Sequence, residues 1–395
     1  MTQSEHVLAE LPTARQCPFS PPQEITELIE EEPIVRMEYP DGHIGWLVSS
    51  HDLARKVLAH PEISARHELR RYPVPFPIKL GPAAPGVFVG MDPPQHTKYR
   101  KPLAKAFSAG QARDFEPELD RITNEVLDDM AKHGNEGDLV ALFALPMPIK
   151  VISQILGGTP EMSVEFQQLR MPILTPGTPP EQIRAAMMRT TELMHGLVAA
   201  KRAQPADDVL STLIAEGTLT DDELAVIALQ VFGAGHETTA HMIALGAYLL
   251  LERPELRERL TTEGPWTDEA ADELLRYLTI AQFITRAALS DLEFGGVKVS
   301  KGDTITVALH AANRDPVRFP EPDTFDPERA ENGHLTFAHG VHKCVGVHLA
   351  RAELRYAMPA LFRRFPGLKL ATTPDQIGTR DAMLTYGVNQ LPVTW

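Results

Sequence analysis

Residues 232–251, FGAGHETTAHMIALGAYLLL, restrict the fold more than any other segment, because a run this apolar is stable only when it is buried. A glycine, two histidines, a glutamate and two threonines nevertheless interrupt its centre. A membrane-spanning helix needs about 20 predominantly apolar residues with few or no charges. The interruption therefore predicts a helix in the core of a protein, with polar groups that serve a site.

One interpretation of these polar groups is a zinc-protease helix, and the spacing excludes it. That motif places two histidines four residues apart, so that both lie on one helix face. His236 and His241 are five residues apart and diverge by about 140° around a helix. They cannot both ligate one metal ion without breaking the helix.

The hydrophobic periodicity of the chain predicts a mainly α fold with a minor β part. Helices are expected at residues 52–59, 95–108, 115–132, 146–156, 161–171, 181–203, 206–215, 221–252, 254–262, 266–278 and 346–364. Strands are expected at His43–Ser49, as two short strands within residues 292–309, and near the C-terminus within residues 383–395.

Length, charge and cysteine content narrow the class of protein. The 395-residue chain has no Gly/Ser-rich linker, low-complexity run or internal repeat, so we expect a single domain over residues 1–395. A formal net charge of −15 argues against a general affinity for nucleic acid. The first residues lack the basic start and apolar core of a signal peptide. Two cysteines, Cys17 and Cys344, without an export signal favour a reducing cytoplasm.

Cys344 stands in a glycine-bounded loop directly before a predicted helix, in the segment FAHGVHKCVGVHLARAEL. Unpaired N–H groups and partial positive charge at a helix N-terminus stabilise a thiolate, so we expect a lowered pKa for Cys344. Gly340 and Gly346 allow the backbone to approach the sulfur closely. A thiolate held in this way suits haem iron as an axial ligand.

Two other interpretations of this loop remain open on the residues alone. An inert, buried cysteine before a helix would have the same pattern. A zinc site would draw on His334, His339, His342 and Cys344, but these lack the paired Cys-x-x-Cys or His-x₃₋₅-His spacing that is usual in closed structural sites.

The pattern F-x-x-G-x-H-x-C-x-G around Cys344 resembles the haem-binding loop of the cytochrome P-450 superfamily. Four further motifs match that family in its own order, so the resemblance covers nearly the whole chain, from about Cys17 to the C-terminus. It implies the cytochrome P-450 fold, a triangular α-rich single domain that encloses one haem b per chain. Cys344 would then be the iron ligand, and Phe337 and Gly346 would contact the cofactor.

Ala338 departs from the family's pattern, which usually has glycine at this position. Alanine disfavours a positive φ, so we expect φ to be negative here and the local turn to differ slightly. The segment AANRDPVRFPEPDTFDPER, which precedes the cysteine loop, matches the family's extended, proline-rich meander.

The resemblance assigns four basic side chains to the haem propionates. In MDPPQHTKYRKPL, His96 and Arg100 lie four residues apart on one helix face, where two donors suit a buried carboxylate. Arg286 and His342 fall where the family supplies further propionate contacts.

Glu273 and Arg276 form the family's Glu-x-x-Arg pair, and their spacing places both side chains on one helix face. Arg329, in FDPER, resembles the third member of the family's Glu-Arg-Arg network. A buried ion network fixes geometry more than it stabilises the fold, so we expect it to make the loop of Cys344 rigid.

The polar centre of the long apolar helix resembles the family's oxygen-binding groove. Ala234 and Gly235 would leave space for dioxygen beside the iron, and Thr238 can bend the helix by bonding a preceding carbonyl. By resemblance, the Thr238 hydroxyl hydrogen-bonds the bound dioxygen and Glu237 passes protons inward from solvent. The first histidine of the segment receives no catalytic role, and the second is expected to be structural.

The resemblance implies a haem-thiolate monooxygenase that inserts one oxygen atom of O₂ into a lipophilic small molecule, by hydroxylation or epoxidation, in secondary metabolism. The chain has neither a flavin domain nor an iron–sulfur cysteine cluster. A ferredoxin, reduced by an NAD(P)H-dependent ferredoxin reductase, would therefore supply electrons to a monomeric enzyme. Basic residues on the proximal face would attract that acidic partner, namely Lys98, Lys101, Lys105, Lys343 and Arg351.

Three alternatives would use the same cofactor. An enzyme of oxidative coupling or rearrangement would share these residues. A peroxygenase fed by peroxide would typically lack the acid–alcohol pair, which is Glu237 and Thr238 in this chain. A haem carrier or sensor would need no oxygen-binding groove.

The segments expected to line the substrate pocket are mostly apolar. They are residues 72–90 (a proline-rich lid with Phe76, Ile78 and Phe88), 171–182, those before Gly235, Ile280–Ile284 and Ala382–Leu384.

Overall fold

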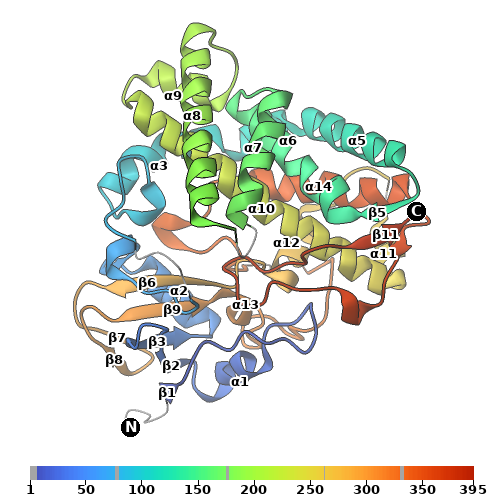
Figure 1. The fold of residues 1–395 in the computed structure, drawn as a ribbon. Helices are drawn as coiled ribbons and strands as arrows, with labels where there is room; N and C mark the ends of the chain where they lie inside the picture. Colours follow the sequence, from blue (N-terminus) through green and yellow to red (C-terminus); the bar gives the residue numbers. More distant parts are fainter. Residues whose placement is uncertain (1–6, 76–79, 175–177, 262, 330–332) are drawn as a thin grey trace.

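The structure is a computed structural model that describes residues 7–75, 80–174, 178–261, 263–329 and 333–395. Helices occupy most of it and strands form small sheets, so the prediction of a mainly α fold with a minor β part is confirmed (Figure 1). The helices are α1 (Gln23–Glu31), α2 (His51–Ala59), α3 (Gln95–Ala106), α4 (Ala109–Asp114), α5 (Glu116–His133), α6 (Pro146–Leu156), α7 (Pro160–Leu174), α8 (Pro180–Ala203), α9 (Val209–Glu216), α10 (Asp221–Glu252), α11 (Pro254–Leu260), α12 (Asp268–Leu278), α13 (Leu309–Ala312) and α14 (Val347–Arg364).

The strands form three sheets among the described residues. The largest has the order β1-β2-β3-β9-β6-β4, the second has the order β10-β11-β5, and β7 pairs with β8 alone. The strands are β1 (Val7–Leu8), β2 (Ile34–Glu38), β3 (Ile44–Val48), β4 (Ile63–Ser64), β5 (Glu136–Asp138), β6 (Phe283–Ala288), β7 (Leu292–Phe294), β8 (Val297–Val299), β9 (Thr304–Ala308), β10 (Lys369–Leu370) and β11 (Pro392–Thr394).

The expectation of two strands within residues 292–309 is wrong, because this segment forms three. Gly295 and Gly296 both have positive φ, at 60° and 81°, and reverse the chain between β7 and β8. Gly302, with φ at 92°, follows β8, and β9 then leaves the hairpin to pair with β3 and β6 in the largest sheet. Two glycine turns therefore divide the segment into three strands, one more than the sequence predicts.

Helix α10 runs through the centre of the helical part and is packed by α6, α8 and α14 (Figure 1). Its first turn is closed by a capping box, in which the Thr220 hydroxyl accepts a hydrogen bond from the Glu223 N–H and the Glu223 carboxylate accepts one from the Thr220 N–H. Every residue from Thr239 to Leu250 is buried. No helix of the described residues is both long and apolar enough to cross a membrane.

Candidate active site

A cavity lies between the centre of α10 and the loop that precedes α14. Its wall is mostly apolar, and the two elements bring together predicted site residues that lie about a hundred positions apart in the sequence. Seven of those residues line it: Ala234, Gly235 and Thr238 on α10, and Phe337, His342, Cys344 and Gly346 on the loop.

Backbone hydrogen bonds shape the cysteine loop. The Cys344 N–H donates to the Phe337 carbonyl at 2.9 Å, and the Lys343 N–H donates to the Gly340 carbonyl at 3.0 Å. Gly340 has φ at 74°, and a Cβ there would lie 2.4 Å from the Leu58 carbonyl oxygen. A side chain at position 340 would therefore push this loop away from α2.

Burial raises the pKa of the Cys344 thiol above its usual value in the iron-free chain. A hydrogen bond from the Gly346 backbone and the charges of Arg100 and Lys343 act in the opposite direction and are outweighed. The Cys344 side chain is open toward the cavity and enclosed by protein elsewhere, so desolvation opposes its ionisation. The expected net lowering of the pKa is thus wrong, although the helix-end groups act in the predicted sense.

Ala338 corrects a second expectation, because its φ is positive, at 58°. Alanine here adopts the left-handed conformation that glycine adopts without strain, at a cost of about 1–2 kcal/mol. A backbone hydrogen bond holds the loop in this conformation, since the Ala338 N–H donates to the Leu335 carbonyl at 2.8 Å. The turn therefore tolerates alanine at position 338 without a change of φ to negative values.

The four side chains assigned to the propionates, His96, Arg100, Arg286 and His342, form one basic cluster. The His96 and His342 rings lie 4.2 Å apart, and Arg100 donates from Nη2 to the Lys343 carbonyl at 2.8 Å. Burial, followed by the charges of Arg286, His96, Arg70 and Arg100, lowers the pKa of His342 to about 3.

Arg70 belongs to this cluster, and the sequence analysis missed it. Its guanidinium donates from Nη1 to the Thr285 carbonyl at 3.1 Å, as does that of Arg286 at 2.9 Å. Arg70 and its neighbour Arg71 lie in a loop without a motif, so only the place of Arg70 beside β6 reveals its role. Burial lowers the pKa of Arg286 to about 10, against a partial offset from Asp92.

The basic cluster fits an anionic group such as haem propionates. Asp92, an acid whose charge acts on Arg286 and His96, already accepts hydrogen bonds from the Ser64 hydroxyl at 2.6 Å and the Ala65 N–H at 2.9 Å. Three buried nitrogen atoms of the cluster find no partner among the described residues, namely Arg70 Nε, Arg100 Nη1 and His342 Nε2. Buried donors of this kind normally have an acceptor, which a carboxylate would supply.

Thr238 makes the hydrogen bond that its sequence context predicts. Its hydroxyl donates to the Ala234 carbonyl at 2.7 Å, and the α-helical assignment of α10 continues through this point. Gly235 lines the cavity, but its missing side chain faces α6, because a Cβ there would lie 3.0 Å from Ile152 Cδ1. Gly235 thus serves the close approach of two helices as well as the space of the groove.

Glu237 lies among basic side chains outside the cavity, whereas Thr238 lines the cavity. Its carboxylate lies 3.2 Å from Arg380 Nη2, 3.3 Å from Arg170 Nη2 and 3.8 Å from His241 Nε2. Burial favours its neutral form, but nearby His241 and the charges of Arg380 and Arg170 outweigh burial and lower the pKa of Glu237 to about 2. Glu237 is not among the described residues that line the cavity.

The two histidines of α10 face different neighbours. His236 is buried and packs edge-on against Phe166, with ring centroids 6.1 Å apart. His241 lies 2.6 Å through Nε2 from Arg380 Nη1. Among the described residues, no group of three or more His, Cys, Asp or Glu side chains could hold a metal ion, so neither zinc interpretation is supported.

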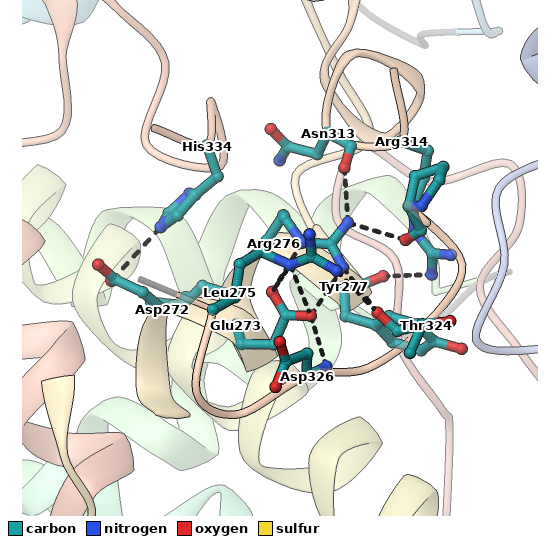
Figure 2. A network of polar contacts seen from close by, with 12 residues as sticks. Asp272, Glu273, Leu275, Arg276, Tyr277, Asn313, Arg314, Thr324, Asp326 and His334 are labelled. Atoms are coloured by element: carbon teal, nitrogen blue, oxygen red, sulfur yellow. Dashed lines mark hydrogen bonds and ion pairs between the residues drawn. The ribbon is translucent and has the colours of Figure 1, made fainter. Parts of the chain in front are cut away.

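The expected Glu-Arg-Arg network is present, and Figure 2 shows its central Glu273–Arg276 pair. Glu273 and Arg276 have no exposed surface and form a two-pronged ion pair at 2.7 and 2.8 Å, and Arg329 Nε lies 3.2 Å from Glu273 Oε2. Arg276 also donates to the Asn313, Pro322 and Thr324 carbonyls, which ties α12 to the meander.

Of the five basic residues predicted for the proximal patch, two are paired with acids. Lys98 lies 2.6 Å from Glu223, and Arg351 forms a two-pronged pair with Asp272 at 2.5 and 3.0 Å. Lys101, Lys105 and Lys343 are exposed and make no ion pair with a described residue.

The predicted substrate pocket is borne out in part. Val231, Ile280 and Ile284 line the cavity, whereas no described residue of 72–90 or of Ala382–Leu384 does. Phe76 and Ile78 of the proposed lid, and residues 175–177 of the segment 171–182, lie outside the described residues.

Comparison with known proteins agrees with this geometry. A family model described as Cytochrome P450 matches residues 165–385. The chain is 40% identical to Cytochrome P450 105C1 of Streptomyces sp, over 97% of each chain. It is 35% identical to 20-oxo-5-O-mycaminosyltylactone 23-monooxygenase of Streptomyces fradiae, over 97% of this chain and 92% of that protein. The chain also superposes, with a TM-score of 0.88 and 30% identity, on the solved structure of mycinamicin VIII C21 methyl hydroxylase MycCI from Micromonospora griseorubida bound to mycinamicin VIII. The match covers 98% of this chain and 100% of that chain.

Proposed function

This chain belongs to the cytochrome P450 family, and from that premise we propose how its own residues perform the family's reaction. The protein is a monooxygenase with haem b as its cofactor. When bound, the haem activates dioxygen with electrons that a redox partner supplies. We propose that residues 1–395 form one domain around it.

One observation carries the assignment of the site: Cys344 and Thr238 line the same cavity from opposite elements. In our proposal, Cys344 is the iron ligand and loses its proton when the metal binds, because a thiolate is the ligating form. Phe337 and Gly346, which line the same cavity as Cys344, would help to hold the cofactor. Ala234 and Gly235 keep the opposite side narrow and largely apolar, which limits the entry of water.

The basic cluster would hold the propionates. Arg100, Arg286, His96 and His342 were assigned to this role from the sequence, and we add Arg70 because its unpaired Nε lies in the same cluster. Charge-assisted hydrogen bonds from guanidinium groups to carboxylates fix orientation as well as affinity. The cluster would therefore set the direction in which the cofactor lies across the cavity.

Thr238 and Glu237 carry the proton supply in this proposal. The Thr238 hydroxyl is held by the Ala234 carbonyl, which leaves its oxygen lone pairs and the cavity side available to dioxygen and water. Glu237 would bring protons from solvent, and its ion pairs with Arg170 and Arg380 would have to open for it to take one. A carboxylate with a pKa near 2 keeps almost no proton at neutral pH while these pairs are closed.

The substrate that we propose is a lipophilic secondary metabolite. The cavity wall near α10 and β6 is apolar at Val231, Ile280, Ile284 and Leu309. The names of two relatives describe oxygenation of a mycaminosyltylactone and of mycinamicin VIII, which supports a tailoring role for this chain. A titration of candidate metabolites should produce the low-to-high-spin shift of the haem spectrum, and a purely hydrophilic set should not.

The redox partner that we propose is an acidic ferredoxin, which an NAD(P)H-dependent ferredoxin reductase reduces. The ferredoxin would dock on the monomeric enzyme at Lys101, Lys105 and Lys343. Surface attraction of this kind is screened by salt, so reduction should slow at high ionic strength and in Lys343→Glu. Lys98→Gln should have the smaller effect, because Glu223 already neutralises Lys98. Equal rates in all three proteins at low and high salt would refute the docking site.

The ligand assignment is tested by the spectrum of the reduced, carbon monoxide-bound protein. Wild type should show the red-shifted Soret band of a thiolate ligand, and Cys344→Ser should lose it. Cys17→Ser is the matched control and should keep the band. A thiolate-type band in Cys344→Ser would remove the assignment.

A further inference from the structure

A second carboxylate of α12, Asp272, forms a polar cluster beside the cysteine loop. It directly precedes Glu273 of the buried ion network, but the two carboxyl groups reach different neighbours (Figure 2). Glu273 pairs with Arg276, whereas Asp272 faces His334, on the segment that leads into the cysteine loop. Two adjacent residues of α12 therefore hold two different parts of the chain.

Asp272 contacts the chain on both sides of Cys344. Its Oδ1 lies 3.4 Å from His334 Nε2, and Arg351, on α14, donates from Nε and Nη2 to its two oxygens at 2.5 and 3.0 Å. His334 precedes Cys344 by ten residues, and Arg351 follows it by seven. The carboxylate thus joins the segment that enters the cysteine loop to the helix that leaves it.

The hydrogen bonds of His334 fix the position of its proton. The Thr336 N–H donates to His334 Nδ1 at 3.2 Å, so the proton of the neutral ring is on Nε2 and faces Asp272. Burial is the main cause that lowers the pKa of His334, against the opposing effect of Asp272. Burial alone would raise the pKa of Asp272, but His334 and Arg351 outweigh it and lower that pKa. Asp272 is therefore an ion that accepts hydrogen bonds from both neighbours.

Both partners of Asp272 also lie against Phe337, which lines the cofactor cavity. The His334 and Phe337 rings have centroids 5.6 Å apart, and the Arg351 guanidinium carbon lies 5.7 Å from the centroid of the Phe337 ring. An arginine at this distance is attracted to the face of an aromatic ring. The Phe337 carbonyl in turn accepts the Cys344 N–H at 2.9 Å, so the cluster reaches the residue that bears the sulfur.

We propose that Asp272 is a positioning residue for the haem-thiolate site. It holds His334 and Arg351 against the Phe337 ring, and Phe337 holds the cysteine loop in the geometry that ligates iron. Asp272 is not among the described residues that line the cavity, so it acts through these neighbours. This inference rests on the proposed function.

The first test follows the spectrum of the reduced, carbon monoxide-bound protein over time, well below its unfolding temperature. Asp272→Asn removes the charge that both neighbours bind. The thiolate-type band should therefore convert to the band of a neutral thiol at least about tenfold faster than in wild type, as expected when hydrogen bonds to a charged group are lost.

Asp268→Asn is the matched control for this test. Asp268 lies on the same helix and is an acid that pairs with α14, through Arg355 at 3.4 Å, but its side chain is 69% exposed. It should convert at the wild-type rate. A purely structural ion pair would lower the unfolding temperature of Asp272→Asn and leave its conversion rate within about twofold of wild type, which overturns the proposal.

The second test separates the hydrogen bonds of His334 from its bulk. His334→Gln can accept from the Thr336 N–H and donate to Asp272, whereas His334→Leu is of similar size and can do neither. His334→Leu should convert about tenfold faster than wild type, and His334→Gln should stay within about threefold of it. Equal rates in the two variants would mean that packing alone positions Phe337, and would overturn the proposal.

Arg351→Lys replaces Asp272→Asn if that variant does not retain haem. Lysine keeps the positive charge, but it has neither the planar group that lies over Phe337 nor the two-pronged contact with Asp272. Its thiolate-type band should convert several times faster than that of wild type. A wild-type rate in Arg351→Lys would refute the role of Asp272.

The two proposals fail in different ways. Without a thiolate-type carbon monoxide spectrum in wild type, the proposed function fails. With that band present in wild type, Asp272→Asn and Asp268→Asn and converting at one rate in all three, the role of Asp272 alone is refuted.

Discussion

The Arg276 guanidinium donates through Nη1 to the Asn313 carbonyl at 2.9 Å, and this bond connects the buried ion network to the cysteine loop. The Asn313 side chain donates to the Thr336 hydroxyl at 3.0 Å, and Thr336 donates to the Leu275 carbonyl at 2.8 Å. Thr336 directly precedes Phe337, whose carbonyl accepts the Cys344 N–H. The network thus reaches the proposed iron ligand through named hydrogen bonds.

Replacing Arg276 with alanine should destabilise the fold strongly. The change removes the bidentate partner of the fully buried Glu273 carboxylate, and breaking a buried ion pair costs about 3–5 kcal/mol. The free energy of urea unfolding measures this loss. Arg259→Ala removes an exposed pair with Glu328 and should cost at most about 1 kcal/mol. Similar losses in the two variants would contradict a structural role for the buried network.

Asn313→Ala should affect the cysteine loop more than the rest of the fold. It removes the side-chain hydrogen bonds to Thr336 and from the Leu335 N–H, the latter at 2.6 Å, and leaves buried partners unsatisfied at about 1–3 kcal/mol each. We expect faster haem loss to apomyoglobin, because the loop is less restrained. Exposed Asn124→Ala is the control and should retain haem as wild type does. Unchanged haem loss in Asn313→Ala would separate the network from the loop.

Local patterns predicted most helices, and they predicted the site only where a motif repeats a family pattern. Thr238 and Cys344 could be placed in one cavity because each lies in such a motif. Arg70 could not, since neither of the adjacent loop residues Arg70 and Arg71 has a periodicity or spacing to mark it, and the role of Arg70 depends on the packing of β6. Glu353, a buried acid of α14 that lines the cavity, was missed for a related reason: nothing in the sequence of a helix reveals which of its acids is buried.

Two expectations, the lowered pKa of Cys344 and the negative φ of Ala338, are wrong because each rests on a single local cause. The helix end was expected to lower the Cys344 pKa, but burial is the larger cause and acts in the opposite direction. The preference of alanine for negative φ was expected to change the turn at Ala338, but the hydrogen bonds of the loop outweigh a local strain of about 1–2 kcal/mol. Both outcomes depend on tertiary structure that a local pattern does not contain.

Ala338→Gly should therefore stabilise the protein. Glycine adopts φ near 58° without the clash of a Cβ, which offsets its greater freedom in the unfolded chain, and we expect a net gain of about 0.5–1 kcal/mol. The opposite sign is expected for Ala104→Gly, at an exposed position inside α3, where glycine costs about 1 kcal/mol. Unfolding free energies of both variants test this, and a loss of stability in Ala338→Gly would show that the φ is unstrained.

His236 should make stability depend on pH in a way that one substitution removes. Burial is the main cause that lowers its pKa to about 4, from an ordinary value of 6.5; Glu237 opposes this, and Arg170 and His241 add to it. Between pH 6.5 and 4, the unfolded chain therefore binds a proton at His236 that the folded chain does not, so stability falls as pH falls.

His236→Gln cannot take up this proton, and the other histidines titrate alike in both proteins. From pH 7 to pH 5, wild type should lose about 2 kcal/mol more unfolding free energy than the variant does. Urea unfolding at the two pH values gives this difference directly, and it does not depend on any constant loss from placing glutamine beside Phe166. Parallel pH profiles would mean that the His236 ring takes up a proton in the folded protein as readily as in the unfolded chain, and hence that its buried environment is wrongly described.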